Sequence, residues 1–168
     1  IFSLPIFLNL DTNKDITFTP NIQTSANNFY NLNYRFLNDN FDINIDTSID
    51  DNSDNSGTSN HLFFDSTIFN QYGSLNAYLK TSNNDTYMRK NKINYLTVLG
   101  SGINFNKETK ENFFSAEVIG YRHLTEKDIT QWEYLFPKLV YNVDKINNNS
   151  LDGTLSLKNE LSVNRNLN

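Results

Sequence analysis

The residues that most often carry catalysis or bind metal ions are few and scattered in this sequence. Its two histidines, His61 and His123, do not lie at a spacing such as His-x-x-x-His that brings two ligands onto one element. The sequence has no cysteine, which excludes thiolate ligands, cysteine nucleophiles and disulfides, and no Gly-x-Ser-x-Gly elbow marks a serine nucleophile. We therefore expect no enzyme, no metal site and no cofactor.

Two polar segments match ion-binding patterns only in part. The segment Asp50–Gly57 spaces oxygen-bearing side chains as a calcium loop does, but it lacks the Gly at the sixth position and the final Glu of an EF-hand. The run Tyr87–Lys92 is basic, which suits a charged connection or an anionic lipid head group. The formal net charge of −5 provides no basic surface, so we expect no nucleic-acid partner.

Strands are the elements that must position the polar side chains. Apolar and polar residues alternate with period two over Asp15–Gln23, Phe29–Leu37 and Phe41–Ile49, whereas a helix needs spacings of three and four. The apolar positions include Ile16, Phe18, Ile22, Tyr30, Leu32, Tyr34 and Phe36. The polar positions include Thr17, Thr19, Asn31, Asn33, Arg35, Asp42, Asn44 and Asp46.

The rest of the chain continues this rhythm. The further predicted strands are Ile1–Asn9, Leu62–Phe69, Gly73–Thr81, Lys92–Leu99, Asn112–Arg122, Tyr134–Val143 and Gly153–Val163. Polar connections rich in Asn, Asp and Ser separate them; two are long (50–60 and 82–91), and a third (125–131) could hold a short helical turn. We predict an all-β fold, an antiparallel up-and-down meander of about ten long strands in a single segment, 1–168.

Two architectures fit this pattern. In a soluble sandwich the apolar face packs in a core, and in an outer-membrane barrel it meets lipid while the polar face lines a wet lumen. No stretch reaches the ~18 apolar residues of a membrane-spanning helix. The predicted strand length of about 8–11 residues, the 9 tyrosines and 13 phenylalanines, and the hydrophobic content of 38% favour a large transmembrane β-barrel.

Two prolines stand inside predicted strands. Pro5 and Pro20 lie in the first two strands, and proline cannot donate a backbone hydrogen bond to a sheet. Two neighbouring strands that each lack a donor form a weak seam. The prolines either block edge-to-edge aggregation or allow this seam to open.

Several segments together resemble the barrel of the lipopolysaccharide (LPS)-assembly family LptD, also called OstA or Imp. The matching segments are, in chain order, Pro5–Asn9, Asp15–Pro20, Leu32–Leu37, Asp85–Arg89, Phe136–Tyr141, Gly153–Leu157 and Arg165. The family's periplasmic jelly-roll domain and most of its barrel of ~26 strands have no counterpart here. The resemblance therefore implies a fragment from the N-terminal part of that barrel.

The resemblance also implies a function, which is transport without chemistry. Proteins of this family insert LPS into the outer leaflet of the outer membrane of Gram-negative bacteria. They work with an LptE-type lipoprotein plug, and their N-terminal domain receives LPS from a periplasmic LptA-type bridge. The sugars pass through the lumen while the acyl chains leave among the outer-membrane lipids between the first and last strands. Pro5 and Pro20 would be the prolines of this lateral gate.

On this interpretation, the eight polar residues from Thr17 to Asp46 named above face the lumen and contact LPS. Arg35 would pair either with a phosphate or with a neighbour such as Asp42 or Asp46. Two alternatives stay open: another outer-membrane channel of the porin type, and a soluble β-sandwich module that binds carbohydrate.

Overall fold

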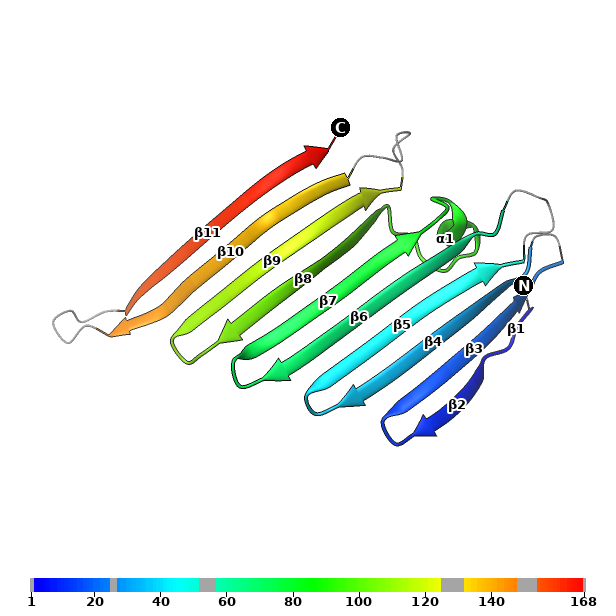
Figure 1. Ribbon diagram of the computed structural model, residues 1–168, viewed down its shortest axis with the longest axis horizontal. Helices are drawn as coiled ribbons and strands as arrows, with labels where there is room; N and C mark the ends of the chain where they lie inside the picture. Colours follow the sequence, from blue (N-terminus) through cyan, green and yellow to red (C-terminus); the bar gives the residue numbers. More distant parts are fainter. Residues whose placement is uncertain (1, 25–26, 52–56, 125–131, 148–153, 168) are drawn as a thin grey trace.

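A computed structural model describes residues 2–24, 27–51, 57–124, 132–147 and 154–167 (Figure 1). It is one open antiparallel sheet of eleven strands in a single layer, with one short helix, so the predicted all-β up-and-down meander is confirmed. The strands are β1 (Phe2–Ser3), β2 (Ile6–Asp11), β3 (Lys14–Ile22), β4 (Phe29–Asn38), β5 (Phe41–Asp50), β6 (Asn60–Asn70), β7 (Gly73–Ser82), β8 (Val98–Glu108), β9 (Asn112–His123), β10 (Trp132–Asn147) and β11 (Thr154–Leu167), and the helix is α1 (Tyr87–Lys90).

The strands from β3 to β11 pair in chain order, and β1 and β2 both pair with β3. The partners Phe2↔Ile22 and Ile6↔Phe18 belong to one unshifted register, so β1 and β2 are two pieces of a single strand. That strand and β11 form the two outer edges of the sheet (Figure 1).

The connections differ at the two ends of the sheet. Turns of two or three residues follow β2, β4, β6 and β8 at one end, and the connections after β3, β5 and β7 lie at the other end, where β1 begins (Figure 1). Asparagine side chains form the tight turns: the amide of Asn40 donates to Asn38 Oδ1 at 2.9 Å, and that of Tyr72 to Asn70 Oδ1 at 2.8 Å. Asn38 and Asn70 therefore stabilise these turns.

One predicted strand, Lys92–Leu99, is wrong. The strand begins at Val98, and residues 83–97 form a connection that contains α1. Side-chain bonds to the local backbone favour this shape, because Asn84 Oδ1 accepts from the amide of Thr86 at 3.0 Å and Asn94 Oδ1 from that of Leu96 at 3.1 Å. The helical turn suggested for 125–131 and most of the calcium-like loop lie outside the described residues.

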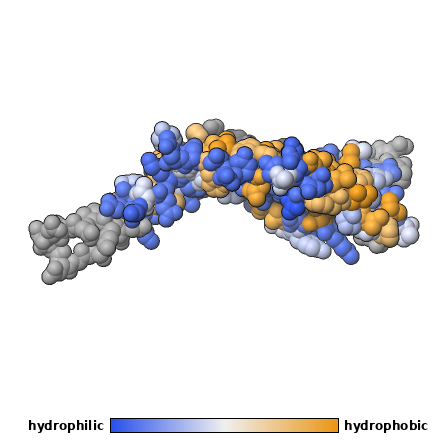
Figure 2. Space-filling model, turned by 90° about the horizontal axis from the view of Figure 1, so that it is seen from below, coloured by the Kyte–Doolittle hydropathy of each residue, from blue (hydrophilic) through white to orange (hydrophobic). Residues whose placement is uncertain are grey.

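The registers place most apolar positions of the strands on one face, which we call the apolar face, while a few, such as Phe63 in the row of Asp46 and Lys80, lie on the other. One row across the apolar face runs Leu8, Ile16, Tyr34, Ile45, Phe64 and Leu79, and a second runs Phe41, Ile68, Leu75, Phe105, Ala116, Leu139 and Leu161. Edge-on, the molecule is a thin bent layer whose surface carries both apolar and polar residues (Figure 2). None of the described helices is long and apolar enough to cross a membrane.

A real core exists at only one place in the described residues. Tyr87 and Met88 of α1, Leu99 at the start of β8 and Leu124 after β9 are buried and pack together, with Phe63 and Ile93 partly buried against them. A single-layer sheet has no second layer to bury its strands. The connection from β7 to β8 supplies one locally, where it folds over the sheet.

Candidate functional site

The eight polar residues expected to share a face do share one, which we call the polar face. Two of its rows run Thr17, Asn33, Asp46 and Thr19, Asn31, Ser48, while Arg35 lies opposite Asn44 and Asp42 stands two residues before Asn44 on β5. The rows arise because side chains two residues apart point to the same side of a strand. β3, β4 and β5 thus form a continuous polar wall.

Amide side chains hydrogen-bond to one another across this wall. Asn33 Nδ2 donates to Asn44 Oδ1 at 3.1 Å, and further along the sheet Asn76 Nδ2 donates to Asn104 Oδ1 at 2.8 Å. Each amide keeps further donors and acceptors, since an Asn side chain can make more than one hydrogen bond. Such a surface suits water and sugar hydroxyl groups.

Arg35 pairs with neither of the two aspartates considered from sequence. Its Nε and Nη2 donate to Asp15 Oδ1 and Oδ2 at 3.1 and 3.0 Å, because Asp15 is the residue directly opposite on β3. Asp42 Oδ1 instead accepts the backbone amide of Thr67 at 2.7 Å. The guanidinium side chain is 59% exposed, so it still reaches solvent on the polar face.

Pro5 and Pro20 meet at the first edge. The common register sets Leu4 opposite Pro20 and Pro5 opposite Thr19, and the Leu4 amide donates to the Pro20 carbonyl at a long 3.4 Å. In an antiparallel pair the N–H and C=O of one residue point to the same neighbour. The return bond from residue 20 is therefore the one that proline removes.

Pro5 acts on the opposite side of the same strand. Backbone directions alternate along a strand, so the residue after Leu4 turns its nitrogen away from β3 toward the outer edge. A strand that pairs with this edge would find no donor at Pro5. The two prolines thus remove one bond on each side of the first strand, and the strand assignment stops at Leu4 and Pro5.

The segment 83–97, which we call the cap, covers the polar face at the end opposite the short turns (Figure 1). Met88 and Leu99 are essentially inaccessible, at 1% and 0% exposed, and Tyr87 is 2% exposed. The Tyr87 hydroxyl and Ser48 Oγ on the polar face are 2.8 Å apart, which fixes the side of the sheet on which α1 lies. Apolar burial of this kind stabilises by about 1.5–3 kcal/mol per large side chain.

Polar contacts tie the cap to distant strands. Arg122 of β9 donates through Nη2 to Asp85 Oδ1 at 2.7 Å and through Nη1 to the Ser82 carbonyl at 2.6 Å. At the other side of the cap, Gln23 Nε2 after β3 donates to Asn91 Oδ1 at 3.1 Å. The cap therefore bridges the sheet from the end of β3 to β9.

A buried hydrogen-bonded chain lies beneath α1. Ser48 Oγ lies 2.6 Å from His61 Nδ1 and 2.8 Å from the Tyr87 hydroxyl, and all three side chains are buried. Burial raises the pKa of Tyr87 above its ordinary value near 10, while the bond to Ser48 lowers it and nearby Asp50 raises it. The serine does not resemble a nucleophile in a substrate cleft, because the tyrosine covers it.

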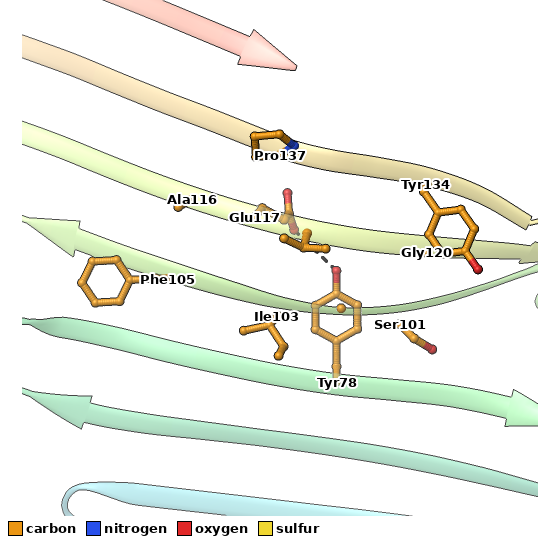
Figure 3. Close-up of a pocket in the computed structure, with 11 residues that line it drawn as sticks. Tyr78, Ser101, Ile103, Phe105, Ala116, Glu117, Gly120, Tyr134 and Pro137 are labelled. Atoms are coloured by element: carbon orange, nitrogen blue, oxygen red, sulfur yellow. Dashed lines mark hydrogen bonds between the residues drawn. The ribbon is translucent and has the colours of Figure 1, made fainter. Parts of the chain in front are cut away.

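The apolar face carries a groove of about 640 Å³ across β7 to β10 (Figure 3). Small residues open it: Ala116 and Gly120 lie between larger neighbours such as Phe105 and Tyr134. On the opposite, polar face of the same strands, the Tyr78 ring crosses Gly102 and its hydroxyl donates to Glu117 Oε1 at 3.4 Å. A side chain at residue 102 would meet this hydroxyl at 2.9 Å and the Val118 carbonyl at 2.4 Å, so glycine is required there.

Comparisons with known proteins leave the family of the chain open. No family model matches it, and no curated protein matches it. Among the described residues, no three His, Cys, Asp or Glu side chains gather as a metal centre. Sequence reasoning located the polar wall and the two prolines but missed the cap, for which the only signal was the long connection 82–91.

Proposed function

We propose that this chain is part of an LptD-type outer-membrane barrel that inserts LPS into the outer leaflet of a Gram-negative outer membrane. The observation that carries the proposal is the first strand, broken at Leu4 and Pro5 beside Pro20 of β3. In this proposal the polar wall lines a hydrated lumen, and the apolar face contacts lipid.

The broken strand supports a lateral gate on energetic grounds. Each missing backbone bond removes about 1 kcal/mol of net stabilisation in water, and more in lipid, which offers no replacement partner. The two prolines lower the cost of separating strands on both sides of the first strand. The strands from β3 to β7, and β8 with β9, pair along long continuous registers, whereas β7 and β8 pair only from Ser74 to Tyr78. Of these seams, the one at the first strand is where proline removes backbone donors.

The single-layer sheet supports a membrane barrel over a soluble sandwich. A sandwich covers its apolar face with a second sheet, but every described strand belongs to the same sheet. Large apolar residues stay exposed on that face, among them Leu32, Ile68, Leu79, Ile103 and Leu161. Exposed apolar surface of this extent marks contact with lipid or another protein.

The partners follow from the proposed family. LPS sugars and phosphates would meet the amide and hydroxyl groups of the polar wall, which offer both donors and acceptors. Arg35 keeps donors for a phosphate beyond its bonds to Asp15, since a guanidinium carries five N–H groups. An LptE-type plug and an LptA-type bridge would contact parts of the full-length protein outside these residues.

The two prolines provide the test of this function. Replacing both, by Pro5→Ala and Pro20→Ala in the full-length protein, restores two backbone donors at the seam. We expect a stiffer gate, less newly made LPS at the cell surface and greater sensitivity to detergent. The measurement is surface labelling of LPS after a pulse, at equal levels of folded barrel.

A matched control changes the same strands without changing their donors. The double variant Leu4→Ala and Ile22→Ala alters exposed apolar side chains of the same two strands and should leave surface LPS close to wild type. Unchanged LPS export in the proline variant would refute the gate. If neither double variant changes LPS export and the protein still conducts small solutes, the porin-type alternative would be favoured.

A further inference from the structure

Three polar atoms without partners belong to residues around Ser48 on the polar face. Asn31 Oδ1, Asp46 Oδ1 and His61 Nε2 are buried, and none has a hydrogen-bond partner among the described residues. Ser48 lies directly between Asn31 and His61 in register, and Asp46 stands two residues before it on β5. Buried polar atoms are nearly always satisfied, so three orphans in adjacent positions point to a missing occupant.

The separation of two of these groups indicates what the occupant is. Asp46 Oδ2 and His61 Nε2 lie 3.8 Å apart, too far for a hydrogen bond. Two atoms bridged by one water are about 4.5 Å apart when its hydrogen bonds have normal length and angle. Ligands bound to one Zn²⁺ at about 2.1 Å lie about 3.4 Å apart at the tetrahedral angle and about 3.8 Å apart at a wider angle of roughly 130°, so the observed spacing is closer to that of two ligands of one ion.

His61 is held in the orientation a metal ligand needs. Its side chain is fully buried, its ring packs 4.8 Å from that of Phe63, and its Nδ1 is 2.6 Å from Ser48 Oγ. When Nδ1 carries the proton and donates to Ser48, Nε2 is left with a free lone pair 3.8 Å from Asp46 Oδ2. Metal-binding histidines commonly donate their second nitrogen to an oxygen in this way.

Asp46 also lacks a permanent cation. Within the described residues, the one ion-pair contact of Asp46 is with His61, which carries a charge only when it is protonated. Lys80, opposite Phe63 in the same row, lies over the Phe63 ring at 6.0 Å, and Arg35 is bound to Asp15. A partly buried carboxylate with an orphaned oxygen attracts a positive ligand.

We propose that Asp46, His61 and Asn31 form a binding site for a divalent transition-metal ion of the Zn²⁺ type. The carboxylate supplies charge, the imidazole supplies the nitrogen that favours such ions over Mg²⁺ or Ca²⁺, and the amide supplies a third oxygen. The side chain of Asp46 is 29% exposed, so the remaining coordination position opens to the polar face. This site does not depend on the proposed transport function.

Calorimetry on the full-length protein in detergent tests the site. Chelator-treated protein is titrated with ZnCl₂ at pH 7, and we expect one high-affinity site per chain that Mg²⁺ at the same concentration does not occupy. Asp46→Asn should weaken this binding at least about tenfold. It removes the charge without removing any hydrogen bond present in the structure, so the fold should persist, as circular dichroism would verify.

Two further variants separate this site from incidental binding. His61→Ala should abolish the high-affinity site, whereas His123→Ala should keep it, although His123 Nε2 also lies 3.5 Å from a carboxylate, that of Glu133. With Co²⁺ in place of Zn²⁺, the visible absorption of the wild type should disappear in Asp46→Asn. The absence of a high-affinity site, or binding that survives both Asp46→Asn and His61→Ala, would overturn the proposal.

Discussion

The first edge and the capped region use strands of the same pattern with opposite results. In β1 and β2 every residue is exposed, and the paired prolines remove donors on both sides of the strand. Under the cap, Met88 and Leu99 are almost completely buried, and Arg122 binds two oxygens of the same connection. One region is poor in backbone bonds and packing, and the other has gained a second layer.

This difference shows how a single-layer sheet can hold both a rigid and a weak region. Local stability varies across a structure with burial and with protected backbone bonds. The cap bridges the sheet from the end of β3 to β9, so it stabilises the strands next to the weak edge. If the first strand separates as proposed, the capped strands should keep their pairing.

Removing the centre of the cap should have the largest effect. Met88→Ala leaves a cavity among Tyr87, Leu99 and Leu124 and should lower the free energy of unfolding by about 2–5 kcal/mol. Denaturant unfolding in detergent measures it. Leu96→Ala, in the same connection but exposed, should cost less than about 0.5 kcal/mol. Equal losses would remove the distinction between cap and surface.

The ion pair of the cap should be worth more than the ion pair near the edge. Asp85→Asn weakens the short contact to Arg122, whose side chain is only 12% exposed, and should cost about 1.5–3 kcal/mol. Asp15→Asn weakens the pair with Arg35, which is 59% exposed and therefore screened by solvent, and should cost clearly less than Asp85→Asn. Thermal unfolding compares the two, and the reverse order would contradict the assignment of the rigid region.

Single proline variants should separate the two sides of the first strand. Pro20→Ala restores a donor toward Leu4 and should stabilise the pairing of β1 with β3 by about 0.5–1.5 kcal/mol. Hydrogen exchange of the Leu4 amide should slow accordingly. Pro5→Ala adds a donor that points away from β3, so it should have little effect on the hydrogen exchange of the Leu4 amide. Equal slowing by both variants would show that the donor directions are misassigned.

The smallest effect expected is a pH dependence of the cap. The folded protein holds Tyr87 neutral with a raised pKa, chiefly through burial. The resulting stabilisation is fully present below the ordinary tyrosine pKa near 10 and is lost as pH rises through the folded pKa. Tyr87→Phe should remove this alkaline loss, which stability measurements from pH 8 to 11 would reveal. A wild type without extra loss above pH 10 would contradict it.

Much of the fold was predictable because period-two alternation is a local property. The strands Phe29–Leu37 and Phe41–Ile49 were located within one residue of β4 and β5, and the polar residues were grouped on the correct face. The wrong prediction at Lys92–Leu99 has a physical cause. The side chains of Asn84 and Asn94 accept hydrogen bonds from backbone amides two residues further along the chain, and these bonds compete with the pairing of a strand. The alternation of apolar and polar residues carries no information about this competition.

The sequence by itself determined which side chains share a face and where proline interrupts a ladder, since both depend on neighbours along one strand. Only the tertiary structure decided which residues meet across strands. Register paired Arg35 with Asp15 and placed Pro20 opposite Leu4, and it brought His61 near Asp46. The cap formed because α1 buries Met88 against side chains distant in sequence, and no local pattern carries that information.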